Sequence, residues 1–175
     1  NHSATHLMHS ALRNTLGDHV QQKGSLVNEE KLRFDFSHKQ KLSENEIFKI
    51  EQEVNKAISS AEDTQIIETS LEESQKLGAI AFFGEKYGEQ VRVLKIAGNY
   101  STELCGGTHV KNSSEIKSFK IISETSISSG VRRIEAISGN LAIQDEADKK
   151  NDLINISETF NTCLLYTSPS PRDVR

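Results

Sequence analysis

Two short motifs constrain the fold of this chain most, because each places two possible metal ligands four residues apart and the motifs lie far from each other. The first, HSATH, carries His2 and His6; the second, CGGTH, carries Cys105 and His109. On a helix, side chains at i and i+4 point the same way, so the first two imidazoles converge. Thiolate and imidazole donors together suit zinc best among common cellular metals. The motifs therefore predict one zinc site, with the first helix packed against the second motif.

Either motif alone is weak evidence for a metal site. Paired histidines on a helix often reflect packing, and a lone cysteine is usually a small buried hydrophobe. The combination is more specific in a chain with two cysteines and six histidines. Within CGGTH, Gly106 and Gly107 would allow the unusual backbone angles and close approach that a loop closing on a metal needs. His9, His19 and His38 have no comparable partners and are expected to be structural or surface residues.

Apolar residues at helical spacing predict an amphipathic helix over 3–16 that ends at Gly17. Ser43 and Glu46 form the pattern of a capping box at the start of a second helix. A short third helix is expected over 71–77.

Alternating apolar residues predict a strand over 32–36, and another strand, regular or bulged at Lys23-Gly24, is expected beside it over 20–27. Four further stretches are strand candidates: GAIAFF, QVRVLKI, FKIIS and GVRRIEAIS. Helices and strands that are mixed without regular βαβ alternation predict an α+β domain.

The 175 residues are enough for one domain with an appendage. We assign 1–140 to that domain, which is expected to be truncated at its N-terminus, and the polar helical pattern of 141–162 to the start of a helical connector. Residues 163–175 show no regular pattern and are expected to be a non-native tail, so Cys163 is set aside. Two cysteines, no secretory signal and no apolar run of roughly 20 residues predict a cytoplasmic protein.

Charge is unevenly distributed along the domain. Residues 43–73 carry nine acidic and two basic side chains, whereas the rest of 1–140 carries ten acidic and fifteen basic ones. A solvated acidic helix explains the first imbalance, and the second leaves room for a polyanion on the opposite face. Charge reversal at Glu51 and Glu53 is therefore expected to leave the affinity for such a polyanion unchanged or raised.

Four ordered stretches carry a family resemblance: NHSATHLMHSALRNTLGDHVQQKGSLVNEEKLRFDFSH, FGEKYGEQVRV, STELCGGTHV and GVRRIEAISG. Over about residues 1–140 they resemble the editing domain of alanyl-tRNA synthetases. The related threonyl-tRNA synthetase domain has an HxxxH helix but lacks the CGGTH form, whereas free-standing alanyl editing proteins share it. The resemblance implies an α+β fold of the threonyl/alanyl-tRNA synthetase second-additional-domain type, with the HxxxH helix packed on an antiparallel sheet.

The resemblance also implies a function: hydrolysis of the ester that joins a wrong amino acid, serine or glycine, to tRNA(Ala) at a zinc pocket. Thr5 would face the amino acid and sense the serine hydroxyl, and Gln22 matches the family's pocket glutamine. The implied partners are the acceptor end of tRNA(Ala) and the rest of the synthetase in cis, with neither DNA nor a membrane. ATP would be used only by the aminoacylation domain, and no GxxxxGK[ST] phosphate-binding pattern occurs in this chain.

The catalytic group stays open at this point. Zinc can lower the pKa of a bound water to about 7, but four protein ligands close a tetrahedral zinc, and closed sites are usually structural. Either one ligand is loose, or zinc shapes a pocket that the tRNA 3′ end completes. A cysteine nucleophile at Cys105 is a third option, although no Cys–His–acid order is evident in the sequence. A non-catalytic zinc module that binds RNA and a free-standing trans-editing deacylase are the alternative functions.

Overall fold

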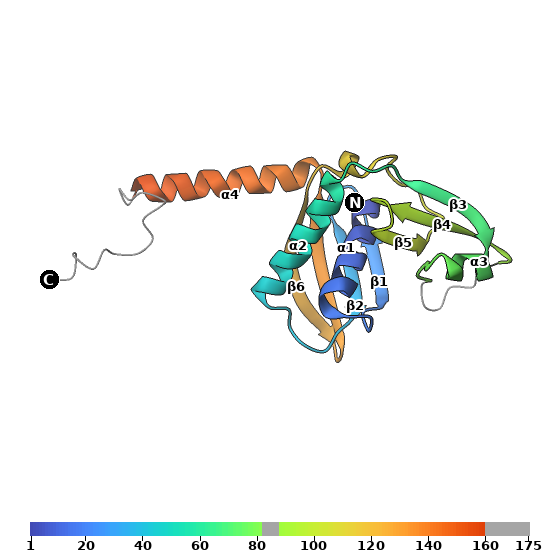
Figure 1. Ribbon diagram of the computed structural model, residues 1–175. Helices are drawn as coiled ribbons and strands as arrows, with labels where there is room; N and C mark the ends of the chain where they lie inside the picture. The colour runs from blue at the N-terminus through green and yellow to red at the C-terminus, as the bar shows by residue number, and fades with distance from the viewer. Residues whose placement is uncertain (82–87, 160–175) are drawn as a thin grey trace.

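The computed structural model describes residues 1–81 and 88–159, which form two antiparallel sheets with helices packed on them (Figure 1). The first sheet has the order β1-β2-β7-β6, with strands β1 (Gln22–Val27), β2 (Leu32–Ser37), β6 (Phe119–Ser128) and β7 (Val131–Ser138). The second sheet has the order β3-β4-β5, with strands β3 (Gln65–Ser70), β4 (Gln90–Ile96) and β5 (Ser101–Leu104). The predicted α+β class is confirmed.

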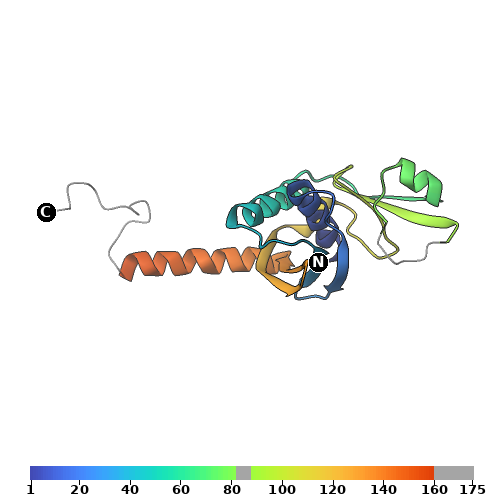
Figure 2. The ribbon, with the colours of Figure 1, turned by 90° about the horizontal axis from the view of Figure 1, so that it is seen from below.

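Helices connect and cover the two sheets. They are α1 (His2–Leu16), α2 (Glu44–Ser59), α3 (Leu71–Lys76), the 3-10 turn η1 (Ser113–Ile116) and α4 (Asn140–Thr159). Helices α1 and α2 lie side by side against the first sheet, and α3 packs on the second, whereas α4 runs away from the body of the molecule (Figures 1 and 2). No helix in the described parts of the chain has the length and apolar composition that crossing a bilayer requires.

Helix α1 lies at the centre of the molecule rather than on its surface. The predicted helix over 3–16 is confirmed, but every residue from Ser3 to Leu12 is buried, so its polar side faces the interior rather than solvent. Its apolar residues, Leu7, Met8, Ala11 and Leu12, belong to the main core. Its buried polar residues are Ser3, Thr5, His6, His9 and Ser10. Buried polar groups need hydrogen-bond partners or ligands, so this helix is where a functional site is expected.

Several local predictions are confirmed. Ser43 Oγ accepts a hydrogen bond from the Glu46 N–H at 3.3 Å, and the Glu46 carboxylate accepts one from the Ser43 N–H at 2.7 Å, which is a capping box. The N–H of Gly17, which has φ 114°, closes α1 on the Arg13 carbonyl. The register of β1 shifts between Gln22 and Gly24, so of the two alternatives for this strand the bulged one is found.

The second sheet was harder to predict. Strands β3 and β5 were not expected, because QIIETS is largely polar and exposed and STEL is only four residues long. Of GAIAFF, Ile80 forms only an isolated bridge with Glu103, and its last two residues lie outside the described part of the chain. Helix α4 confirms a helical pattern after the domain, although its role as a connector stays a prediction. The tail 163–175 also lies outside the described residues.

The acidic helix α2 is only partly solvated. Glu51 is 8% exposed, and its carboxylate accepts hydrogen bonds from the Ile121 N–H at 2.8 Å and from Lys120 Nζ at 2.9 Å. Glu53 accepts a hydrogen bond from the Tyr100 hydroxyl at 3.1 Å. The expectation that Glu51 belongs to a solvated face is therefore wrong, because a lysine there would take the acceptor away from a buried N–H and repel Lys120. Charge reversal at this position would disturb the fold and would not report on RNA binding.

Candidate functional site

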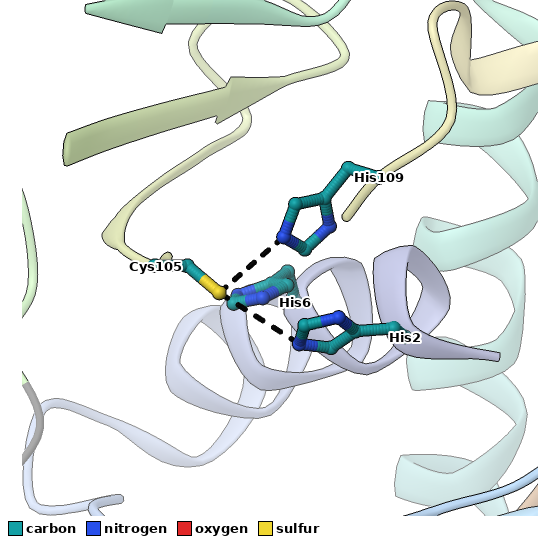
Figure 3. Close-up of side chains that lie close together, drawn as sticks. All are labelled: His2, His6, Cys105 and His109. Carbon is teal, nitrogen blue, oxygen red and sulfur yellow. Dashed lines mark hydrogen bonds between the residues drawn. The ribbon is translucent and has the colours of Figure 1, made fainter. Parts of the chain in front are cut away.

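The four side chains that the sequence singled out lie together (Figure 3). His2 and His6 project from successive turns of α1, Cys105 directly follows β5, and His109 lies four residues further on. One nitrogen or sulfur atom from each lies within 4.8 Å of the others. His109 Nε2 is 3.3 Å and His2 Nε2 is 3.7 Å from Cys105 Sγ. The donor atoms converge as expected, and their binding of a metal stays a prediction.

Strand β4 holds the loop that carries Cys105 in place through Arg92. Arg92 Nη1 donates hydrogen bonds to the carbonyl oxygens of Cys105, at 3.3 Å, and Gly107, and the Cys105 N–H donates to the Arg92 carbonyl at 3.1 Å. Neither Gly106 nor Gly107 has a positive φ, so the left-handed conformation that favours glycine is absent from this loop. Close approach is confirmed at Gly107 alone, where a Cβ would lie 2.4 Å from His2 Cε1.

The two glycines of the loop provide a matched pair of variants. Gly107→Ala is expected to push the His2 ring out of the cluster and to lower zinc affinity at least about 10-fold, an effect comparable to losing a group that orients a ligand. Gly106→Ala should leave zinc affinity near the wild-type value, because a Cβ there meets no atom within 4 Å. Competition with a chromophoric chelator measures both affinities. Equal affinities for the two variants would contradict the close packing of Gly107 on His2.

Glu103 is the part of the site that the sequence analysis missed. Its carboxylate is 1% exposed and accepts hydrogen bonds from His6 Nδ1 at 2.5 Å and His9 Nδ1 at 2.9 Å. A proton fixed on Nδ1 of His6 turns the lone pair of Nε2 toward the cluster, which is how carboxylates usually orient histidine ligands. The available signal was the alternation of a strand, because Glu103 and Cys105 are two residues apart and share a face.

Ser3 orients His109, the fourth candidate ligand, as Glu103 orients His6. Its Oγ accepts a hydrogen bond from the Val110 N–H at 3.2 Å and lies 3.3 Å from His109 Nδ1. With the proton on Nδ1, His109 donates to Ser3 and leaves Nε2 facing the Cys105 sulfur. A buried serine on α1 therefore ties the second motif to the first.

The electrostatics of the site favour a positive charge at its centre. Burial alone would raise the pKa of the Cys105 thiol, but hydrogen bonds from His109, His2 and His6 lower it to about 3. Burial would also raise the pKa of Glu103, but hydrogen bonds from His6 and His9 lower it to about 2. Burial would lower the pKa of His6, yet its bonds to Cys105 and Glu103 raise it to about 9. The Cys105 thiolate and the Glu103 carboxylate thus both contact the His6 imidazolium. A metal cation can replace the proton that His6 directs toward the sulfur.

A cavity of about 460 Å³ opens onto the cluster. Both residues predicted to contact substrate, Thr5 and Gln22, line it together with His2, His6 and Cys105. Thr5 Oγ1 donates a hydrogen bond to the Asn1 carbonyl at 3.1 Å, so the threonine does bond back to its own helix. A hydroxyl that donates still has acceptor capacity. Thr5 can therefore accept a hydrogen bond from a ligand in the cavity.

Two kinds of chemistry fit this donor set. Cys105, His6 and Glu103 have the order thiolate, imidazole, carboxylate that a nucleophilic cysteine uses, an arrangement that was not evident in the sequence. Such a nucleophile needs one imidazole, however, whereas His2 and His109 also lie against the same sulfur. One thiolate and three imidazoles are the ligand types of a four-coordinate zinc. The residues present therefore fit zinc better than a catalytic triad.

Comparisons with known proteins agree with the motifs. A family model described as the threonyl and alanyl tRNA synthetase second additional domain matches residues 91–135. The alanine–tRNA ligase of Alkaliphilus metalliredigens (strain QYMF) is 60% identical over 142 residues, which are 81% of this chain and 16% of the ligase. The chain belongs to the alanyl-tRNA synthetase family. Its matched residues 91–135 run from β4 through Cys105 and His109 into β7, so they contain one half of the candidate site.

Further alanyl-tRNA synthetase relatives extend over nearly all of the chain. The alanine–tRNA ligase of Alkaliphilus oremlandii (strain OhILAs) is 51% identical over 162 residues, which are 93% of this chain and 18% of the ligase. That of Listeria innocua serovar 6a is 48% identical over 174 residues, which are 99% of this chain and 19% of the ligase. The chain thus spans less than one fifth of the length of these curated relatives. It contains an editing-type domain of the alanyl-tRNA synthetase family.

Proposed function

We propose that this chain is the editing portion of an alanine–tRNA ligase and hydrolyses Ser-tRNA(Ala) and Gly-tRNA(Ala). The observation that carries the proposal is the convergence of His2, His6, Cys105 and His109 beside a cavity that Thr5 and Gln22 also line. The rest of the ligase would act in cis in the cytoplasm, and ATP would serve its aminoacylation reaction alone. The partner of this site would be the acceptor end of tRNA(Ala).

Hydrolysis of an aminoacyl ester requires few catalytic groups, because the ester is already activated. Hydrolysis needs a placed water and stabilisation of the developing oxyanion. Zinc held by the four ligands would supply positive charge at that place. Gln22 offers amide N–H groups that can hold the ester, and Val27 and Phe34 supply apolar wall to the same cavity. Thr5 would accept the hydroxyl proton of serine in a hydrogen bond.

A deacylation assay on the 175-residue chain tests this function. Zinc-loaded protein should release serine from Ser-tRNA(Ala) far faster than alanine from Ala-tRNA(Ala), because a methyl group leaves the polar groups of the cavity unpaired. Tight binding of tRNA(Ala) without release of serine would favour the non-catalytic RNA-binding module instead. Equal release of serine and alanine would contradict an editing role.

The serine sensor can be tested by one pair of variants. Thr5→Val keeps the shape of the side chain, removes the hydroxyl and should slow Ser-tRNA(Ala) hydrolysis about 10-fold, from one lost hydrogen bond of about 1–2 kcal/mol. Gly-tRNA(Ala) hydrolysis should change much less, because glycine has no hydroxyl. Thr5→Ser keeps a hydroxyl and serves as the control. Equal losses on both substrates would assign Thr5 to the helix, through its bond to Asn1, and would end the sensor role.

A further inference from the structure

Three neighbouring cavities follow one another from the candidate site along α1. The cavity beside the cluster shares His9 and Gln22 with a smaller cavity of about 140 Å³. That cavity in turn shares Arg13 and Ile80 with a third one of about 470 Å³. The three cavities are therefore adjacent, and we call them together the groove, which extends from the cluster along the C-terminal half of α1 to the second sheet.

The far end of this groove is positively charged. Arg13, Lys76 and Lys95 line it, and its described lining includes no aspartate or glutamate, although the Glu53 carboxylate accepts hydrogen bonds from the lining residues Asn14 and Tyr100. Lys95 Nζ donates a hydrogen bond to Asn99 Oδ1 at 3.1 Å, and Lys76 has only an exposed contact with Glu73 at 3.7 Å. Arg13 differs, because it is paired with Asp18 and bonded to loop carbonyls and so holds the end of α1. Among the described residues, Lys95 therefore makes no ion pair, and Lys76 has only its long, exposed one with Glu73.

We propose that the far end of the groove binds phosphates of the single-stranded 3′ end of the RNA while its terminal ester lies at the cluster. This inference rests on the proposed function, because it assumes that the aminoacyl ester of the RNA is hydrolysed at the cluster. Arg13 follows His6 by seven residues, which is about 10 Å along a helix axis. Phosphates a few nucleotides before the 3′ terminus thus reach Lys76 and Lys95. A basic track beside the reaction pocket is how proteins hold single strands without reading their sequence.

The test measures binding separately from catalysis. A fluorescent hairpin with the acceptor stem of tRNA(Ala) and its single-stranded 3′ end is titrated with the 175-residue chain over a range of salt concentrations. Lys76→Ala/Lys95→Ala should weaken binding about 10-fold and flatten the dependence of log Kd on log salt by about 1.4, which is about 0.7 for each lost phosphate contact on a single strand. Lys39→Ala/Lys41→Ala removes the same charge from the loop after β2 and should change binding much less.

A hairpin without the single-stranded 3′ end identifies which part of the RNA the lysines meet. With this probe the groove variant and the wild type should bind alike. If both double variants lose the same affinity, or if the groove variant keeps the wild-type salt dependence, the proposal is overturned. The proposed function fails differently, through absent serine release, and the binding result stands independently of that outcome.

Discussion

Replacement of Cys105 by serine is expected to lower zinc affinity about 100-fold or more and to abolish most release of serine from Ser-tRNA(Ala). Serine has nearly the same size, but its hydroxyl stays protonated at neutral pH, whereas the surrounding imidazoles hold the pKa of the Cys105 thiol at about 3. Structural zinc sites contribute about 10–16 kcal/mol in total, so losing the one anionic ligand of four removes a large share. Chelator competition gives the affinity, and the deacylation assay gives the rate.

The second cysteine of the chain is the matched control for this change. Cys163→Ser should bind zinc and release serine as the wild type does, because the proposed ligand set contains only Cys105. Circular dichroism of both variants checks that the helices are retained. A Cys105→Ser protein that binds zinc as tightly as the wild type would exclude the sulfur from the site.

Replacement of Glu103 by glutamine should lower zinc affinity by about 10–100-fold, the range typical of groups that orient a ligand. The amide keeps the shape but carries no charge, so both His6 and His9 lose an anionic partner, and because its NH2 group cannot accept, one of them also loses its hydrogen-bond acceptor. A buried donor left without an acceptor also costs about 1–3 kcal/mol of stability. Zinc affinity and the free energy of unfolding by urea are therefore both expected to fall.

His9→Gln separates the two effects of the Glu103 change. His9 shares the carboxylate but is not one of the four converging residues. Its replacement should reduce stability while the bond between His6 and Glu103 keeps the ligand oriented. Equal losses of zinc affinity in the Glu103 and His9 variants would mean that the carboxylate supports only the core.

The local signals in the sequence were strong where one short stretch determines the structure. Ser43 and Glu46 determine the start of α2 within a single turn, and alternating apolar residues identify β2 and β7. The weak signals belong to β3 and β5, where tertiary contacts rather than composition make the strand. The burial of α1 on all sides is likewise a tertiary property, because its sequence alone resembles that of a surface helix.

The residues of the candidate site also divide into those that a short stretch of sequence reveals and those that only tertiary contacts reveal. His2, His6, Cys105 and His109 were recognisable because metal ligands come in short spaced pairs. Glu103 was not, because β5 was not predicted, and without that strand its alternation with Cys105 could not be used. Glu51 is the same case on α2, where the sequence suggested solvent and the fold provides Lys120 and a backbone N–H. For an acidic residue, the partner from another element decides its role.

One titration tests most directly whether these residues form one metal-dependent hydrolytic site. Zinc is added to protein from which a chelator has removed all metal, and the rate of serine release from Ser-tRNA(Ala) is recorded. The rate should rise in proportion to bound zinc and reach its plateau at one zinc per chain. Full activity in the stripped protein would contradict the claim and would favour Cys105, with His6 and Glu103 behind it, as a nucleophile.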